Sequence, residues 1–449
     1  VACPGAPLDR TRDHDRPEPE VVRWTGGMAE RGPVGERGVA RVLSGPAAGV
    51  VGGSLFEPPD CADMVTFDMG GTSSDVGLAR QGTVERTTDA TVGGHPVQVP
   101  MVDVETVGAG GGSVARVDSG GALRVGPRSA GADPGPACYG RGGGKPTVTD
   151  AAVVCGYLGP ETTLGEGLEL DTDAATSALT DLANEAGLDG PVAAARGVRR
   201  VANAAMTRAI RRVTLERGHD PREFALVAFG GAGPMHAAGL ADRLGIDTVT
   251  IPVASGVCSA LGMLAADERH DASRTHRVRL GAADPEQVTD RYEQLTDRAL
   301  ADVSDPDRAT VDRAADLRYT GQSHELTVAV PDGFDPDRVA ERFHRVHERR
   351  RGYHLDEPVD LLTLRVTATV PGDPPPLAHD GTHPDPVEHR AVSFADEFRE
   401  TPVYDRDLPA GTGFDGPAVV AGGESTTVVP PDWRVTVDDR GTIRMEASG

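Results

Sequence analysis

The chain has 449 residues, of which 69 are Asp or Glu and 45 are Lys or Arg, so its formal net charge at pH 7 is −24. This surplus of acid argues against nucleic acid as a partner, because one polyanion repels another. No run of about 18 apolar residues occurs, so no membrane-spanning helix is predicted. The length is sufficient for two or three domains, each with its own core.

The cysteines are scattered, odd in number and free of any CxxC pair: Cys3, Cys61, Cys138, Cys155 and Cys258. This pattern argues against a disulfide framework and a zinc finger, and it fits a reducing compartment. The opening stretch also lacks the apolar segment of a secretory signal. We therefore expect a cytoplasmic protein.

Lys145 is the only lysine, whereas arginine is plentiful. An acidic surface almost without lysine predicts adaptation to high salt, where repulsion among the acidic side chains is screened. A high-GC genome that favours arginine codons would give the same bias, and the two explanations are compatible.

Residues 1–35 are rich in Pro, Asp and Arg and are expected to be irregular. Short apolar runs then predict strands over 62–71, 73–80 and 102–110. A helix is predicted over 171–186, where Asp171 is a suitable N-cap.

A longer helix is predicted over 191–217, with Pro at its start, apolar residues at helical spacing and Gly218 after its end. The stretch 224–252 alternates strand, glycine turn, helix and strand, which indicates a βαβ unit and a parallel α/β sheet. Beyond residue 280 the sequence predicts helices near 284–303 and 335–350, with strands between and after them. A proline-rich linker leads to a tail of short strands and turns.

The stretch "DMGGTSSDVGL", residues 68–78, follows an apolar strand. Gly70 and Gly71 allow the backbone to approach a ligand and to direct successive amides at it, and hydroxyls follow from Thr72 onward. An aspartate at a strand end, such as Asp68, is suited to hold hydrated Mg²⁺ or to orient an attacking water. A tight hairpin is the structural alternative.

Three further glycine-rich loops occur, at residues 44–53, where a Ser-Gly-Pro turn precedes a predicted helix of small residues, and at 107–114 and 229–237. The last lies between a strand and a helix N-terminus, where the helix dipole favours anions. Any one of these loops is explained by close packing, but four of them together suggest a nucleotide cleft.

Other common catalytic motifs are absent from the sequence. "GRGGGKPT" ends in Lys-Pro and is not a Walker A loop, and neither HExxH nor GxSxG occurs. Four histidines, His324, His344, His347 and His354, are interpreted as surface residues. His236 is a candidate polar residue of the cleft, with packing at the helix N-terminus as the alternative.

Taken in order, these loops resemble the hydantoinase A/5-oxoprolinase family. The matching stretches are "VLSGPAAGVVGG", "DMGGTSSDVGL", "VETVGAGGGSVARVDSGGALRVGPRSAGADPGPACYGRGG", "PTVTDA", "NAAMTRAIR", "DPREFALVAFGGAGPMHAAGLA", "GVCSALGMLAAD", "RYTGQSHEL" and "STTVVPP". The resemblance covers nearly the whole chain from Trp24 onward.

The resemblance implies an α/β, actin-like ATPase lobe that continues into an α+β region and ends in a small β-rich domain. It implies this division of the chain: 1–35 as the remnant of a preceding lobe, 36–275 as the ATPase lobe, 276–375 as the α+β region and 376–449 as the β-rich domain. It further implies ATP and Mg²⁺, or another divalent cation, as cofactors.

Site residues follow from the same resemblance. Asp68 and Asp75 are expected to be catalytic, with Asp68 also the metal ligand. The expected nucleotide contacts are Gly70, Gly71, Thr72, Gly110, Gly111, Gly112, Ser113, Gly230, Gly231, Gly233 and Pro234. The stretch 129–139 has no assigned role; Cys138 within it is either a nucleophile or, as we prefer, structural.

The implied reaction is ATP-dependent opening of a cyclic amide such as a hydantoin or 5-oxoproline, with a hydantoinase B-type subunit as partner. A subunit of an ATP-dependent ketone carboxylase and a nucleotide-binding remnant without turnover are the alternatives. Family members usually open with an additional DxGGT loop well before the one matched here, whereas this chain has only the DxGGT of residues 68–72. We therefore expect that roughly 200 residues of a first lobe are missing and that this polypeptide alone turns over little ATP.

Overall fold

The computed structural model describes residues 21–22, 28–29, 44–87, 90–92, 95–97, 101–159 and 167–448. The chain divides into two compact units. One, here called the glycine-loop unit, is built from Val39–Ala265 and Pro374–Gly449, and the other, the α+β unit, is built around Ala266–Asp373. The irregular structure expected over residues 1–35 lies outside the described residues, except for two short strands, β1 (Val21–Val22) and β2 (Met28–Ala29).

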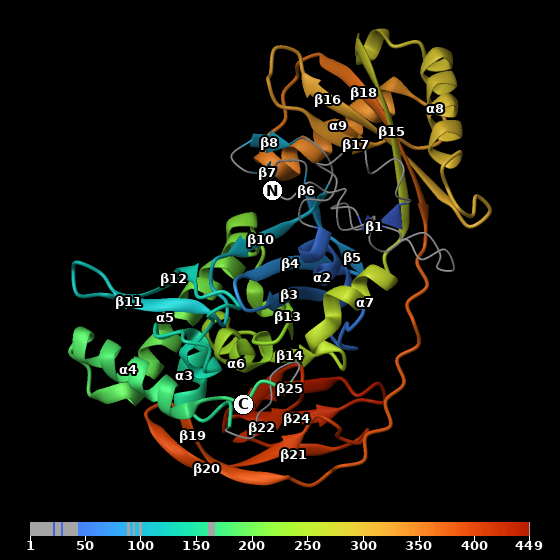
Figure 1. Ribbon diagram of the computed structural model, residues 1–449. Helices are drawn as coiled ribbons and strands as arrows, with labels where there is room; N and C mark the ends of the chain where they lie inside the picture. The colour runs from blue at the N-terminus through green and yellow to red at the C-terminus, as the bar shows by residue number, and fades with distance from the viewer. Residues whose placement is uncertain are drawn as a thin grey trace, which may run out of the picture. The chain divides into compact units, whose positions relative to one another are not determined.

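A nine-stranded sheet forms the framework of the glycine-loop unit (Figure 1). Its strands lie in the order β10 (Val104–Val107), β4 (Ser74–Arg80), β3 (Asp63–Met69), β13 (Ala225–Phe229), β14 (Thr248–Ile251), β25 (Ile443–Ala447), β24 (Trp433–Val437) and β21 (Gly413–Asp415), with β5 (Thr83–Val84) beside β4. The strands β3, β13 and β14 are parallel to one another. The predicted βαβ unit is confirmed as β13, α6 (Gly233–Leu244) and β14.

Helices cover both faces of this sheet (Figure 1). Successive side chains of a strand point to opposite faces. Accordingly, Phe67 and Leu226 belong to the core that includes α5 (Gly190–Val213) and α6, whereas Met64 and Val227 pack on the side of α7 (Cys258–Leu264). The five-residue strand β13 is buried throughout, as expected of a parallel strand covered on both faces.

The predicted helices are confirmed, although those predicted over 191–217 and near 284–303 end earlier, at Val213 and Leu300. Helix α4 (Thr172–Ala186) starts after Asp171, whose side chain accepts a hydrogen bond from the Ala174 amide. Helix α5 ends at Val213, before the predicted residue 217, because Thr214 leaves helical geometry at φ −106° and ψ −83°. Residues Leu215–Arg217 continue as a short 3-10 turn that Gly218 closes.

Helix α2 (Ser44–Ser54) packs closely on α7, because glycines remove the side chains between them. A Cβ on Gly52 would lie 2.2 Å from the Cys258 carbonyl oxygen, and a Cβ on Gly262 would lie 1.9 Å from that of Ala48. Real Cβ atoms do not approach backbone so closely, so glycine at both positions sets the separation of the two helices.

The remaining elements of the glycine-loop unit are shorter. They are β6 (Arg86–Thr87), β7 (Ala90–Val92), β8 (His95–Val97), β9 (Met101–Val102), the hairpin of β11 (Ser113–Val117) and β12 (Leu123–Ser129), and α3 (Val148–Val154). A second sheet contains β19 (Glu388–Phe394), β20 (Glu397–Asp405), β22 (Ala418–Ala421) and β23 (Thr426–Val429), and it packs on α6 through β23. Because β24 and β25 join the large sheet, the β-rich tail lies in the same unit as the glycine loops. That residues 376–449 form a domain of their own stays a prediction.

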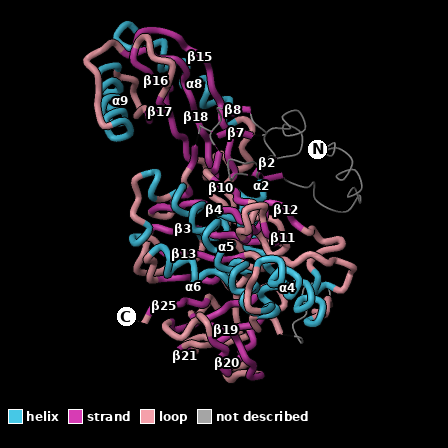
Figure 2. Tube along the Cα trace, turned by 90° about the vertical axis from the view of Figure 1, so that its left-hand side faces the viewer, coloured by secondary structure: helices cyan, strands magenta, loops and turns pink. Residues whose placement is uncertain are grey.

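In the α+β unit, β15 (Glu268–Arg279), β18 (Val359–Val370), β16 (Thr310–Tyr319) and β17 (Leu326–Ala329) form a sheet (Figure 2). One hydrophobic core lies between this sheet and the helices α8 (Pro285–Leu300) and α9 (Pro336–Arg351). Both helices start with Pro after an aspartate N-cap, Asp284 and Asp335, whose side chains accept hydrogen bonds from first-turn amides. Among the described residues, no helix has the length and apolar character needed to cross a membrane.

We predict that Gly262→Ala lowers the free energy of unfolding by about 1–3 kcal/mol, because the added methyl group forces α7 away from α2. Gly45→Ala is the matched control, since a Cβ at this position of α2 meets nothing within 4 Å. Urea unfolding of both variants measures the effect. Equal stability of Gly262→Ala and the unmodified chain would refute the close packing described above.

Candidate functional site

The stretch 68–75 is a hairpin whose turn is open to solvent. Strand β3 pairs with β4 so that Asp68 lies opposite Asp75, and the Gly70 amide donates to the Ser73 carbonyl at 3.1 Å. Gly70, Gly71 and Thr72 are exposed. The hairpin alternative is therefore correct for the backbone, and the same turn presents main-chain amides at the carboxyl end of β3.

The second glycine loop braces this turn from one side. The Gly111 amide donates to the Gly70 carbonyl at 3.0 Å, and the Gly112 amide donates to that of Gly71 at 2.6 Å. A Cβ on Gly110 would lie 2.6 Å from the Thr72 nitrogen, so only glycine fits there. The Gly110 amide in turn donates to the Ser113 hydroxyl at 2.8 Å. The amides of this loop are thus engaged within the protein, and its direct role is to hold the hairpin turn in place.

The third glycine loop closes on the same point from the neighbouring strand. Strands β13 and β3 are in register, with Phe229 beside Asp68, so their carboxyl ends coincide. The Ala232 amide donates to the Met69 carbonyl at 2.9 Å. Gly230 has a φ of +79°, and a Cβ on it would lie 2.3 Å from Asp68 Oδ1. Gly231 is exposed, whereas Gly233 and Pro234 are buried in the first turn of α6.

The structure therefore brings together all the loops that the sequence singled out at 68–75, 110–113 and 230–234. They meet at the carboxyl ends of parallel strands, where open α/β sheets bind their ligands. Whether each residue contacts a ligand stays a prediction.

Two carboxylates face each other in this site. Burial raises the pKa of Asp68 above its ordinary value, the Ser259 hydroxyl opposes this shift, and repulsion from Asp75 adds to it. Burial likewise raises the pKa of Asp75, against the effect of the Thr106 hydroxyl, which donates to Asp75 Oδ1 at 2.5 Å. Among the described residues, no Arg, Lys or His side chain pairs with either carboxylate, and such a pair of carboxylates is a suitable environment for a divalent cation.

A cation at Asp68 would need oxygen ligands from outside the protein as well. In the described part of the chain no group of three or more His, Cys, Asp or Glu side chains is arranged to hold a metal ion. Phosphate oxygens and water are the ligands that Mg²⁺ usually takes beside one or two carboxylates.

Sequence reasoning missed Ser259 and Thr106, the hydroxyl donors to the two aspartates. Ser259 Oγ donates to Asp68 Oδ2 at 3.0 Å across a separation of 191 residues. The stretch "GVCSALGM" was noted for its resemblance, but nothing in one sequence assigns its serine to a distant aspartate.

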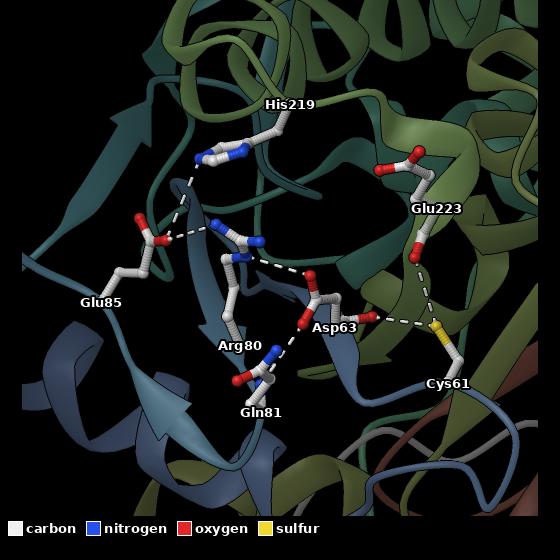
Figure 3. A network of polar contacts seen from close by, with 7 residues as sticks. All are labelled: Cys61, Asp63, Arg80, Gln81, Glu85, His219 and Glu223. Atoms are coloured by element: carbon white, nitrogen blue, oxygen red, sulfur yellow. Dashed lines mark hydrogen bonds and ion pairs between the residues drawn. The ribbon is translucent and has the colours of Figure 1, made fainter. Parts of the chain in front are cut away.

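A polar network occupies the opposite, amino end of β3 (Figure 3). Arg80 pairs with Asp63 at 2.9 Å, and Cys61 donates to the Asp63 and Glu223 carbonyls. These contacts tie β3 to β4 at the far end from the glycine loops. The Arg80 side chain is partly exposed, so the pair contributes little stability.

A hollow of about 600 Å³ in the glycine-loop unit lies beside the third glycine loop rather than over the hairpin turn. Its walls include Val253, Ser255, Arg390, Arg406, Glu424 and Ser425. It adjoins the loop through Ser255, whose carbonyl accepts from the Gly230 amide at 2.8 Å.

The motif "PTVTDA" has a structural role. Asp150 is fully buried and accepts hydrogen bonds from the amides of Ala137, Cys138 and Thr147 and from the Thr147 hydroxyl. It thereby fixes the 3-10 turn η3 (Ala137–Tyr139). Burial, with the Asp150 carboxylate nearby, raises the pKa of the Cys138 thiol. A thiol so protected is a poor nucleophile, which supports the structural interpretation of Cys138.

Two of the histidines that the sequence singled out, His236 and His347, are packing residues. His236 is buried, its Nδ1 lies 2.6 Å from Asn203 Oδ1, and burial together with Arg199 lowers its pKa to about 3. The packing alternative is thus favoured for His236. The interpretation as a surface residue is wrong for His347, which is buried and bonds through Nδ1 to the Tyr353 carbonyl, because α9 turns it into the core.

Residues 11–272 match the model of the hydantoinase/oxoprolinase family. The chain is 38% identical over 443 residues to caprolactamase subunit alpha of Pseudomonas jessenii, covering 94% of this chain and 63% of that subunit. It is 32% identical over 454 residues to 5-oxoprolinase of Saccharomyces cerevisiae, covering 93% of this chain and 35% of that enzyme. The chain thus spans less than two thirds of the length of these relatives.

Two solved structures are similar over nearly the whole chain. The crystal structure of ATP-dependent caprolactamase from Pseudomonas jessenii has a TM-score of 0.82 at 34% identity and covers 97% of this chain and 66% of that one. The nucleotide-free structure of acetone carboxylase has a TM-score of 0.78 at 25% identity and covers 95% of this chain and 64% of that one. These likenesses confirm the predicted fold, an α/β actin-like ATPase lobe with a C-terminal α+β region and β-rich end.

We predict that Asp150→Ala lowers the free energy of unfolding by about 3 kcal/mol, because several buried donors lose their acceptor at once. Asp171→Ala is the control: this carboxylate caps α4 through a single bond to the Ala174 amide, and its loss should cost about 1 kcal/mol. Chemical denaturation of both variants provides the comparison, and equal losses would contradict the role given to Asp150.

Alkylation of the native protein tests the assignment of Cys138. At about pH 8 iodoacetamide should label the partly exposed Cys61 and leave the buried Cys138 unmodified, because only thiolates react. Peptide mass spectrometry after labelling reads out each site. Rapid modification of Cys138 in folded protein would restore it as a candidate nucleophile.

Proposed function

The chain belongs to the hydantoinase/oxoprolinase family, and from this premise we propose that it takes part in the ATP-dependent hydrolysis of a cyclic amide of the hydantoin, 5-oxoproline or lactam type. The observation that supports the proposal most is the convergence of three glycine loops on Asp68. Gly71 and Thr72 are exposed and lie within one turn of that carboxylate, and the Gly70 amide holds the turn itself by donating to the Ser73 carbonyl. Such a turn is suited to hold phosphate oxygens beside a cation.

We assign the hairpin turn to the phosphates and the Gly230–Gly231 turn to the neighbouring part of the nucleotide. Asp68 would hold Mg²⁺, directly or through water, and Asp75 would add negative charge on the same side. The raised pKa values of both aspartates, which burial causes, fit this assignment, because a bound cation would stabilise the buried carboxylates in their charged form. When bound, Mg²⁺ neutralises the charge that develops on the phosphates.

The chemistry follows from the stability of amides. The ring carbonyl is resonance-stabilised, and its oxygen is a poor place for negative charge. Transfer of the γ-phosphoryl group of ATP to that oxygen forms a C–O–P linkage and releases ADP. Water then attacks the activated carbon and the C–N bond breaks, which frees the amine and leaves an acyl phosphate. A second water hydrolyses this acyl phosphate to the carboxylate of the opened amino acid and inorganic phosphate. The chain's part is to align the phosphates through backbone amides. These amides are already in position, so they stabilise the negative charge that develops on the phosphates without any rearrangement of the protein.

We propose a hydantoinase B-type subunit as the partner in this reaction. The similarity to a caprolactamase subunit named alpha supports a multi-subunit enzyme. Because the chain spans only part of the length of its relatives, the activity of the whole protein is part of the proposal. We also propose that the protein works at high salt, because its net charge is −24.

A ketone carboxylase subunit is the second candidate, favoured by the structural likeness to acetone carboxylase. Both reactions use ATP to activate a carbonyl oxygen, so the phosphate-binding loops do not distinguish them. ATP hydrolysis that depends on bicarbonate and a ketone would identify the carboxylase, whereas hydrolysis that depends on a cyclic amide alone would identify the amidase.

We predict that Asp68→Asn lowers phosphate release from ATP about 100-fold or more, measured with a cyclic amide, the B-type subunit and an added N-terminal lobe, because the cation loses its protein ligand. Asp63→Asn is the matched control, since Asp63 lies on the same strand but at its other end, beside Arg80. A colorimetric phosphate assay measures both. Full activity of Asp68→Asn would refute the proposed site.

A further inference from the structure

The second residue of α7, Ser259, contacts the carboxylate at the centre of the site. Its Oγ donates to Asp68 Oδ2 at 3.0 Å. The other oxygen, Oδ1, faces the Gly230 turn, where a Cβ would approach it to 2.3 Å. Within the described part of the chain, no donor reaches Oδ1. The two oxygens of Asp68 therefore differ: one is held by the protein and the other is free for a ligand.

The position of Ser259 is fixed by the packing of α7 on α2. The close approach at Gly52 and Gly262 sets the distance between the helices. A Cβ on Gly49 would lie 3.0 Å from Ser259 Oγ and 3.4 Å from Asp68 Oδ2, so the serine and the aspartate share one confined space beside α2. A short hydroxyl side chain held in this way has little freedom to turn away from the carboxylate.

We propose that Ser259 is a positioning residue for cation binding at Asp68. Its hydroxyl occupies Oδ2 and so orients the carboxylate with Oδ1 toward the glycine loops. This gives a role to two sequence stretches that the nucleotide-binding proposal alone leaves unexplained, "SGPAAGVVGG" of α2 and "GVCSALGML" of α7. The inference rests on the proposed function, because it needs a cation and a nucleotide at the hairpin turn.

The test uses Mn²⁺ as a probe, titrated into the protein with a non-hydrolysable ATP analogue and followed by electron paramagnetic resonance. Ser259→Ala should raise the Kd for Mn²⁺ about tenfold, the effect of losing one hydrogen bond to a charged group. Ser259→Cys keeps the volume but donates weakly, and it should weaken binding in the same direction. Ser54→Ala, which removes a hydroxyl bonded only within α2, should leave the Kd unchanged.

Thermal melting without Mn²⁺ separates positioning from folding, since the Tm of Ser259→Cys should stay close to that of the unmodified protein. If both Ser259 variants bind Mn²⁺ as tightly as the unmodified protein, the inference is overturned while the proposed function stands. If the unmodified protein itself binds no Mn²⁺ in the presence of the analogue, the proposed function fails, and the positioning role fails with it.

Discussion

The candidate site depends on the parallel pairing of β3 with β13. This pairing places Phe229 beside Asp68, so the chain leaves both strands at the same edge of the sheet. Backbone hydrogen bonds then join the glycine turns that follow the two strands, for example the bond from the Ala232 amide to the Met69 carbonyl. Without this register, Asp68 and the Gly230 turn would lie on different parts of the molecule, and no amide cluster would form.

Much of this arrangement was predictable from the sequence. Apolar runs that end in glycine gave the strands and the βαβ unit, and the order of the loops indicated a shared cleft. The glycines themselves carry the signal, because positions such as Gly230 admit no other residue without a clash against Asp68. Residue type restricts the local backbone conformation, and each loop is therefore recognisable from the sequence by itself.

Side-chain partners across long separations were not predictable. The bond from Ser259 to Asp68 depends on how α7 packs on α2, and the burial of His347 depends on which side of α9 meets the sheet. The roles of Asp150 and Cys138 are of the same kind: the residue types suggested chemistry, whereas the fold uses them to hold a turn. One sequence contains no measure of such tertiary contacts.

The central claim is that the main-chain amides of Gly71 and Thr72 hold the phosphates of a nucleotide beside Asp68. A crystal structure of the protein with ADP and Mg²⁺ tests it most directly. The account predicts phosphate oxygens within hydrogen-bond distance of these amides and the cation on the Asp68 side of them. Phosphates bound elsewhere, for instance in the hollow lined by Arg406 and Glu424, with Gly71 and Thr72 free of ligand, would contradict it.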